Sequence, residues 1–335
     1  MSNPTRSPST SPPAAEATIA PDAPRGRRVT IEHVRDYGII VVFIVLFVVL
    51  SITSPSFLSV DNLLNIVRQN TAVGIIACAA TLVIIGGGFD LSVGAVYFLA
   101  GVASAWIAVH VNVPLALLCG IVVGFLLGGF NGLLSTRLNI SSFLATLATS
   151  LVFAGAGAAI TKGFPITVSD PAFAKLGTEG IGRLTYSVMV FAVVAIVLQL
   201  VLTRTTFGRY VFAVGGNSEA ARNSGVRVDR IRVTTFIVSG MAAGLAGVID
   251  ASTVSSGGTD SGASLILSSI AAVALGGTSI FGGVGAVWKT ILGVMLLAMI
   301  ANGFDLLSIA SYYQDMFEGF VIIVAVAINS LAIKQ

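Results

Sequence analysis

The chain has 335 residues, of which 55% are hydrophobic and only 10% are charged, and its formal net charge is +3. A soluble domain carries roughly 25% charged residues, so this composition excludes a water-soluble fold. The apolar residues form long runs instead of period-2 or period-3.6 stripes, which predicts membrane-spanning helices in a lipid bilayer. Basic loops on one side of the membrane account for the net positive charge, so we expect no nucleic-acid partner.

Residues 1–34 are predicted to form a disordered cytoplasmic tail. Pro, Ser and Ala dominate this region, and six of the ten prolines lie in it. Such a segment has too little apolar surface to fold by itself. We expect no cleavable signal peptide, because no apolar run follows the first residues. The remainder, 35–335, is predicted to be one transmembrane domain.

The predicted fold is all-α and polytopic, with about ten transmembrane helices. A helix needs roughly 20 apolar residues to cross about 30 Å of hydrocarbon. The segments that approach this length are 37–53, 70–86, 93–110, 113–135, 141–161, 185–203, 231–252, 263–276, 285–302 and 312–331.

Ten crossings bring both termini to one side, and the basic residues identify that side as the cytoplasm. The residues predicted on or near it are Arg6, Arg25, Arg27, Arg28, Arg35, Arg137, Arg204, Arg209, Arg222, Arg227, Arg230, Arg232, Lys289 and Lys334. Those predicted outside are Arg68, Lys162, Lys175 and Arg183.

A glycine-rich break separates the second and third segments, where residues 86–94 read Gly-Gly-Gly-Phe-Asp-Leu-Ser-Val-Gly. Carboxylates are costly in a bilayer and often mark a solute or ion route, and broken helices are tolerated where they line a cavity. Asp90 and Ser92 are therefore candidates for a solute path. Asp90 can instead cap the helix that follows. Both interpretations stay open, and they are compatible.

Residues 87–96 are also weakly similar to 276–287, which are glycine-rich in the same way. This similarity predicts a fold of two related halves, as is common in transporters. Close helix packing through small residues explains it equally well.

The longest predicted cytoplasmic connection, at about 203–230, contains a short capped helix. Asn217 is a good N-cap, Glu219 lies in the first turn, and Gly225 can end the helix in a left-handed turn. A helix of under three turns is marginal alone in water, so we expect it to pack against a partner. The alternative is an ordinary basic loop.

The chain shows no catalytic residues. None of its four lysines follows a glycine, which excludes a P-loop, and His-Glu-x-x-His and Gly-x-Ser-x-Gly motifs are absent from the sequence. The two cysteines and two histidines have no ligand spacing, so we expect no metal or cofactor in this chain. An ion-driven secondary transporter acting alone remains a rival, although no set of intramembrane cations is available to pair with the acids.

Several ordered motifs resemble the permease family of bacterial carbohydrate ABC importers, which contains the ribose, xylose, arabinose and galactose permeases. They lie at 87–94, 131–132, 143–147, 213–226, 274–279 and 282–283. The resemblance covers roughly residues 37–333. Phe89 departs from it, because a smaller aliphatic residue is expected there.

The resemblance implies alternating-access import of a monosaccharide across the bacterial inner membrane. It also implies a permease homodimer, a cytoplasmic ATPase that binds ATP and Mg²⁺, and an extracytoplasmic solute-binding protein. A related permease for nucleosides, branched-chain amino acids or a signalling sugar is the alternative. The segment expected to contact the ATPase comprises Gly215, Gly216, Asn217, Ser218, Glu219, Ala220, Ala221, Arg222 and Gly225. The candidates for the solute path, chosen from polar or aromatic side chains in or beside the apolar segments, are Phe89, Asp90, Ser92, Asn131 and Asn302.

Overall fold

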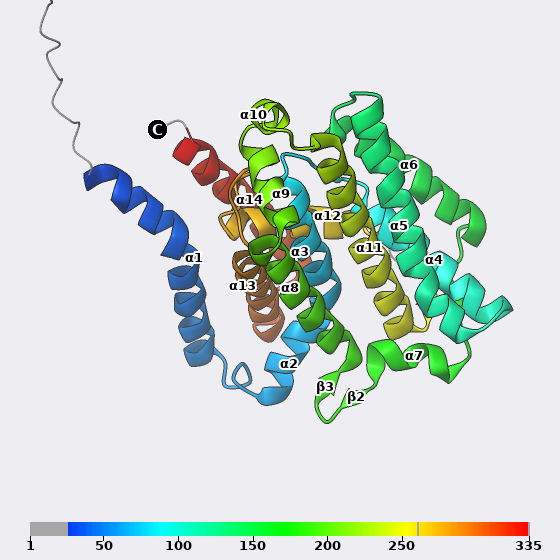
Figure 1. Cartoon of the computed structure of the whole chain (residues 1–335). Helices are drawn as coiled ribbons and strands as arrows, with labels where there is room; N and C mark the ends of the chain where they lie inside the picture. The colour runs from blue at the N-terminus through cyan, green and yellow to red at the C-terminus, as the bar shows by residue number, and fades with distance from the viewer. Residues whose placement is uncertain (1–25, 260, 334–335) are drawn as a thin grey trace, which may run out of the picture.

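A computed structural model of the protein describes residues 26–259 and 261–333, and most of them are helical (Figure 1). A helix coincides with each of the ten predicted apolar segments. The helices are α1 (Gly26–Thr53), α2 (Val60–Gln69), α3 (Thr71–Ile85), α4 (Val93–His110), α5 (Val113–Arg137), α6 (Ser142–Thr161), α7 (Pro171–Thr178), α8 (Tyr186–Arg204), α9 (Thr206–Gly216), α10 (Ser218–Asn223), α11 (Val228–Val254), α12 (Ala263–Leu275), α13 (Val287–Leu306) and α14 (Ser311–Ile333).

Within the described residues, six helices are long and apolar enough to cross a membrane: α4, α5, α6, α8, α11 and α13. Helices α2 and α3 pass the same test as a pair that is bent by 52°. The prediction of a polytopic membrane protein is therefore confirmed. The count of ten crossings stays a prediction.

Helix α1 corrects the predicted boundary of the tail. It begins at Gly26, so residues 26–34 are helical and were wrongly predicted to be disordered. The physical reason is that no proline occurs between Pro24 and Pro55, and every residue of this stretch can donate its backbone N–H. Residues 1–25 of the predicted tail lie outside the described residues.

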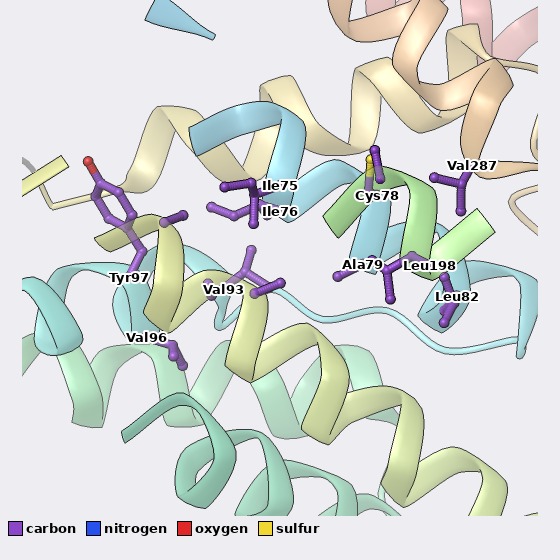
Figure 2. Packing of buried hydrophobic residues seen from close by; sticks show 14 of the residues in the cluster. Ile75, Ile76, Cys78, Ala79, Leu82, Val93, Val96, Tyr97, Leu198 and Val287 are labelled. Atoms are coloured by element: carbon purple, nitrogen blue, oxygen red, sulfur yellow. The ribbon is translucent and has the colours of Figure 1, made fainter. Parts of the chain in front are cut away.

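Helix α3 forms the centre of the apolar core. All but two of its 15 residues are buried, as expected for a helix that is covered by other helices on every side. Figure 2 shows Ile76, Cys78 and Leu82 of α3 close to Val93 of α4 and Leu198 of α8, which belong to the same buried cluster.

Helices α5 and α11 pack with their backbones almost in contact. Gly120 and Gly124 of α5 face Gly244 and Gly240 of α11, and a Cβ on any of the four would meet a main-chain carbonyl of the opposite helix. Small residues allow this approach, which drives association of helices in membranes where the hydrophobic effect is absent.

Helices α3 and α12 end in the same way. Each is capped by a glycine, Gly86 or Gly276, and the next residue, Gly87 or Gly277, has a positive φ of 77° or 74°. In both, three successive N–H groups donate to carbonyls four, three and five residues back. Many helices end with this glycine geometry, so the fold of two related halves stays a prediction.

Four short strands lie among the connections between helices. β1 (Ile166–Thr167) pairs antiparallel with β4 (Ser256–Gly257), and β2 (Gly180–Ile181) pairs with β3 (Leu184–Thr185). Figure 1 shows α7, β2 and β3 at one end of the bundle, and α9 and α10 at the opposite end. The two ends therefore carry different connections.

Candidate solute pathway and coupling region

A buried carboxylate, Asp90, holds the break between α3 and α4. Its Oδ1 accepts hydrogen bonds from the Ser92 N–H at 3.0 Å and the Ser92 hydroxyl at 2.6 Å. Its Oδ2 accepts from the hydroxyl of Ser239 on α11 at 2.8 Å. The Asn131 side chain of α5 donates to Ser92 Oγ at 2.6 Å. We call these four residues the Asp90 network.

The Asp90 network brings together three of the five predicted path residues, but it is closed to solvent. Asp90 is 7% exposed, and Ser92 and Asn131 are fully buried. Three donors satisfy the carboxylate, which is how a buried charge is tolerated. Ser92, not Asp90, occupies the N-cap position of α4, and Asp90 accepts the N–H of that residue. The network therefore holds α4, α5 and α11 together at the helix break.

One polar atom of the Asp90 network has no partner in the described part of the chain. It is the side-chain oxygen Oδ1 of Asn131. Unsatisfied buried polar atoms are few in native proteins and are often found where a structure changes or binds. This oxygen is a buried acceptor with no donor among the described residues, so it can accept a hydrogen bond from another group.

The structure does not place Phe89 and Asn302 in the network. The Phe89 N–H donates to Ser142 Oγ of α6 at 3.1 Å, while its ring packs against a buried cluster of α3, α12 and α13 residues. Asn302 exchanges two hydrogen bonds with Asn62 of α2, at 3.0 and 2.9 Å. Its amide is engaged in this pair and not in the Asp90 network, and the role of Asn302 in the solute path stays a prediction.

A polar cavity that the sequence analysis missed lies between α2, β3 and α8. Its volume is 480 Å³, within the range typical of small-molecule sites. Its polar lining residues are Asp61, Asn62, Asn65, Arg68, Arg183 and Thr185. Arg183 and Asp61 form an exposed ion pair at 3.6 Å on its rim.

A second cavity of 260 Å³ adjoins the first through the shared residues Asn65 and Arg68. It leads to Gln69, Asp250 and Thr253. Asp250 also borders a smaller recess that contains Tyr97 of α4. Polar side chains thus continue from the end of the bundle at α7 toward its interior. We call the cavities of 480 and 260 Å³ the α2 cavities.

The sequence contained a signal for the α2 cavities. In α2 the polar residues Asp61, Asn65 and Arg68 recur at helical spacing, as do Asn62 and Gln69, while apolar residues occupy the other face. This segment was not recognised from the sequence, because its ten residues are too few and too polar to form a long apolar run. Carboxylate, amide and guanidinium groups together can bind a neutral polar solute through hydrogen bonds.

The predicted short helix is present at the opposite end as α10. Asn217 Oδ1 accepts from the N–H groups of Glu219 and Ala220, at 3.1 and 2.9 Å, and Gly225 has a φ of 84°. Both predicted caps are therefore confirmed. Helix α9, which has 11 residues and ends immediately before Asn217, was not predicted from the sequence.

Helix α10 has an exposed and a buried side. Glu219, Ala220 and Arg222 are exposed, whereas Ala221 is 6% exposed and packs with Val214 and Val228. Ala221 therefore attaches α10 to α9 and α11. The exposed residues are the ones available to another protein.

Glycines connect the end of α9 to the breaks after α3 and α12. The Gly283 N–H donates to the carbonyl of Ile85, the last residue of α3, at 2.8 Å. A Cβ on Gly215 would collide with that carbonyl and lie 2.7 Å from Gly283 N, and a Cβ on Gly282 would lie 2.9 Å from the Gly215 carbonyl. We call Ile85, Gly215, Gly282 and Gly283 the glycine junction.

These features define a polytopic membrane protein, and comparison with known proteins assigns the family. The chain belongs to the family described as "Branched-chain amino acid transport system / permease component", whose model matches residues 62–326.

Among its relatives, the ribose import permease protein RbsC of Haemophilus influenzae is 39% identical over 301 residues, covering 88% of this chain and 93% of that protein. RbsC of Bacillus subtilis is 38% identical, covering 85% and 89%. The L-arabinose ABC transporter permease protein AraH of Azospirillum brasilense is 34% identical, covering 96% and 95%. No solved structure matches the chain significantly. The family resemblance seen in the motifs is confirmed.

Proposed function

We propose that the chain is the permease subunit of an ABC importer that moves a monosaccharide, a pentose such as ribose or arabinose, across the inner membrane. The observation that carries this proposal is the 34–39% identity to permeases named for ribose and arabinose over 85–96% of the chain. The family description names branched-chain amino acids, but the sugar permeases match along nearly the whole length.

The α2 cavities are the proposed entrance for the sugar. A monosaccharide presents hydroxyl groups that both donate and accept, and so it needs donors and acceptors at close spacing. Asn65 and Gln69 supply amides that do both, Arg68 supplies donors, and Asp250 supplies acceptors. From there the solute moves inward when the helices exchange an outward-open for an inward-open packing.

The proposed topology has ten crossings with both termini in the cytoplasm. It is supported by the separation of basic residues between the two ends of the bundle. Arg137, Arg222, Arg227 and Arg230 line one cavity beside α10, while Arg68 and Arg183 line the first α2 cavity. By the positive-inside rule, this separation supports a cytoplasmic position for α9 and α10.

Helix α10 is the proposed contact with a partner ATPase, which binds ATP and Mg²⁺ and supplies the energy. The residues proposed for coupling are Gly215, Gly216, Asn217, Ser218, Glu219, Ala220, Arg222 and Gly225, with Ala221 anchoring the helix from its buried side. The glycine junction supports this role, because a displacement of α9 acts directly on the backbone at the ends of α3 and α12. A second permease copy and an extracytoplasmic solute-binding protein complete the proposed assembly.

Reconstitution tests the proposal. Proteoliposomes that contain this chain, its ATPase and its binding protein are expected to accumulate labelled ribose or arabinose only when ATP is supplied on the α10 side. Glu219→Lys is expected to abolish uptake without loss of insertion, because it reverses the charge on the exposed first turn of α10 and opposes the helix dipole. Glu179→Lys, at an exposed position on the end of α7, is the matched control.

Cross-linking adds a geometric test. A cysteine at exposed Ala220 is expected to cross-link to the ATPase, and one at buried Ala221 is not. Full uptake by Glu219→Lys would contradict the coupling role. Concentrative uptake by the chain alone, driven by an ion gradient, would support a secondary transporter instead.

A further inference from the structure

A basic pocket lies beside α10 and is lined by three elements. Its volume is 570 Å³, and residues of the C-terminal end of α5, of α10 and of the N-terminal region of α11 form its wall. Its charged residues, four arginines and one aspartate, are Arg137, Arg222, Arg227, Arg230 and Asp229. The pocket therefore carries a net positive charge.

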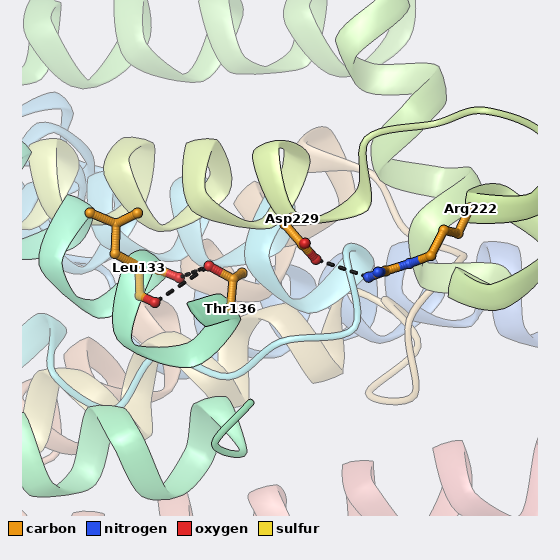
Figure 3. A network of polar contacts seen from close by, with 5 residues as sticks. Leu133, Thr136, Arg222 and Asp229 are labelled. Carbon is orange, nitrogen blue, oxygen red and sulfur yellow. Dashed lines mark hydrogen bonds and ion pairs between the residues drawn. The ribbon is translucent and has the colours of Figure 1, made fainter. Parts of the chain in front are cut away.

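The single acid among the lining residues does not neutralise the pocket. Asp229 binds Arg222, with Nη2 2.9 Å from Oδ1, as Figure 3 shows. Arg137, Arg227 and Arg230 face the pocket with no second carboxylate among the lining residues. Helix α11, with 27 residues, begins here, and the side chain of its N-cap residue, Arg227, makes no capping hydrogen bond. The positive end of its dipole therefore adds to the charge of the arginines, against the one carboxylate of its first turn, Asp229.

The position of the pocket relative to the bilayer indicates its ligand. Both α5 and α11 are candidate membrane spans, with Arg137 in the last turn of α5 and Arg230 near the first turn of α11. Arginines at the ends of spanning helices lie at the level of lipid headgroups. Toward the membrane the lining becomes apolar, with Leu133 48% exposed. An arginine rim above an exposed leucine matches a headgroup above its acyl chain.

We propose that this pocket binds the phosphate of an anionic phospholipid from the leaflet on the α10 side. Guanidinium groups bind phosphate oxygens in pairs, and basic pockets between membrane helices hold anionic headgroups. The identification of that leaflet as cytoplasmic rests on the proposed function, whereas the binding itself requires only this chain and a lipid. Because Arg222 belongs to α10, a bound headgroup fixes the position of α10 relative to α5 and α11.

Lipid binding by the purified full-length chain tests the proposal. We expect delipidated protein to retain phosphatidylglycerol over phosphatidylcholine of the same acyl composition, measured by native mass spectrometry. The double variant Arg137→Gln/Arg230→Gln is expected to lower the apparent affinity for phosphatidylglycerol about tenfold or more, since each arginine near a membrane surface contributes roughly a fivefold effect. Arg204→Gln/Arg209→Gln removes the same charge from exposed positions outside the pocket and is expected to keep the lipid.

Charge-conserving variants separate a specific pocket from general attraction. Arg137→Lys/Arg230→Lys keeps the charge but loses paired bonding, so an intermediate affinity is expected. Equal loss in the pocket and control variants would overturn the proposal. Saturable binding of inorganic phosphate without preference among lipids would identify a free-anion site instead. Weaker ATPase association with unchanged lipid binding would identify a protein-docking site, and it too would overturn the proposal. None of these measurements depends on sugar uptake, so failure of the proposed function is distinguished from failure here.

Discussion

The Asp90 network and the α2 cavities are both polar regions of a membrane protein, yet they differ in their access to solvent. The Asp90 carboxylate is buried and satisfied by three donors from Ser92 and Ser239. The α2 cavities are open and lined by polar side chains from several elements. A charged residue in an apolar sequence can therefore serve packing, while the open polar cavities are formed by a short amphipathic helix together with residues of neighbouring elements.

The largest effect is expected from Asp90→Ala, because stability should depend on this network. The change leaves the Ser92 and Ser239 donors buried without an acceptor, which costs about 3 kcal/mol. Thermal unfolding of the detergent-solubilised chain measures it. Asp229→Ala removes an exposed carboxylate whose ion pair contributes less than about 1 kcal/mol, and is the control. A stable Asp90→Ala protein with altered sugar preference would reverse the assignment of the two regions.

The glycine junction sharpens the comparison, because it lies just before the loop that holds Asp90. Gly215→Ala is expected to cost about 2 kcal/mol and to uncouple ATP hydrolysis from uptake, since its Cβ meets a backbone carbonyl that cannot rotate away. Gly155→Ala on α6 is the matched control, because a Cβ there meets nothing within 4 Å and the residue lies outside the proposed coupling segment. The measurements are unfolding temperature and the ratio of transported sugar to hydrolysed ATP. Identical behaviour of the two variants would remove the junction from the coupling mechanism.

Asn65→Ala tests the α2 cavities directly. Loss of one hydrogen bond to the sugar is expected to raise the KM for uptake about tenfold, equivalent to about 1.4 kcal/mol, with no change in unfolding temperature. Asn65 lines both cavities, so it is the residue of choice. Lys175→Gln provides the control, with little expected change, because Lys175 is an exposed residue of α7 that lines neither cavity. An unchanged KM in Asn65→Ala would place the solute path elsewhere.

The smallest effect is expected from Asn302→Ala. It breaks the amide pair with Asn62 and costs about 1 kcal/mol of stability, while KM stays at the wild-type value. The same unfolding and uptake assays check it. A raised KM for sugar uptake in an Asn302→Ala variant of normal stability would place Asn302 in the solute path.

Features that depend on a few neighbouring residues were predictable from the sequence. Apolar length located a helix at each of the ten segments, and Asn217 and Gly225 were recognised as helix ends because a cap depends on a few neighbouring residues. The pairing of Asn302 with Asn62 was not predictable, because the two residues lie 240 positions apart in the chain. The α2 cavities were missed because their lining comes from α2, α8, α11 and the β3 region, which only the folded bundle brings together.

By itself, the sequence determined that this protein is a helical membrane protein with a capped helix in a long connection, because hydrophobic length and capping are properties of contiguous residues. Only the tertiary structure decided that Asp90 is enclosed by α5 and α11, that Gly215 touches the end of α3, and that four arginines share one pocket. Burial and approach of side chains depend on which helices become neighbours, and that choice is made by packing across the whole chain.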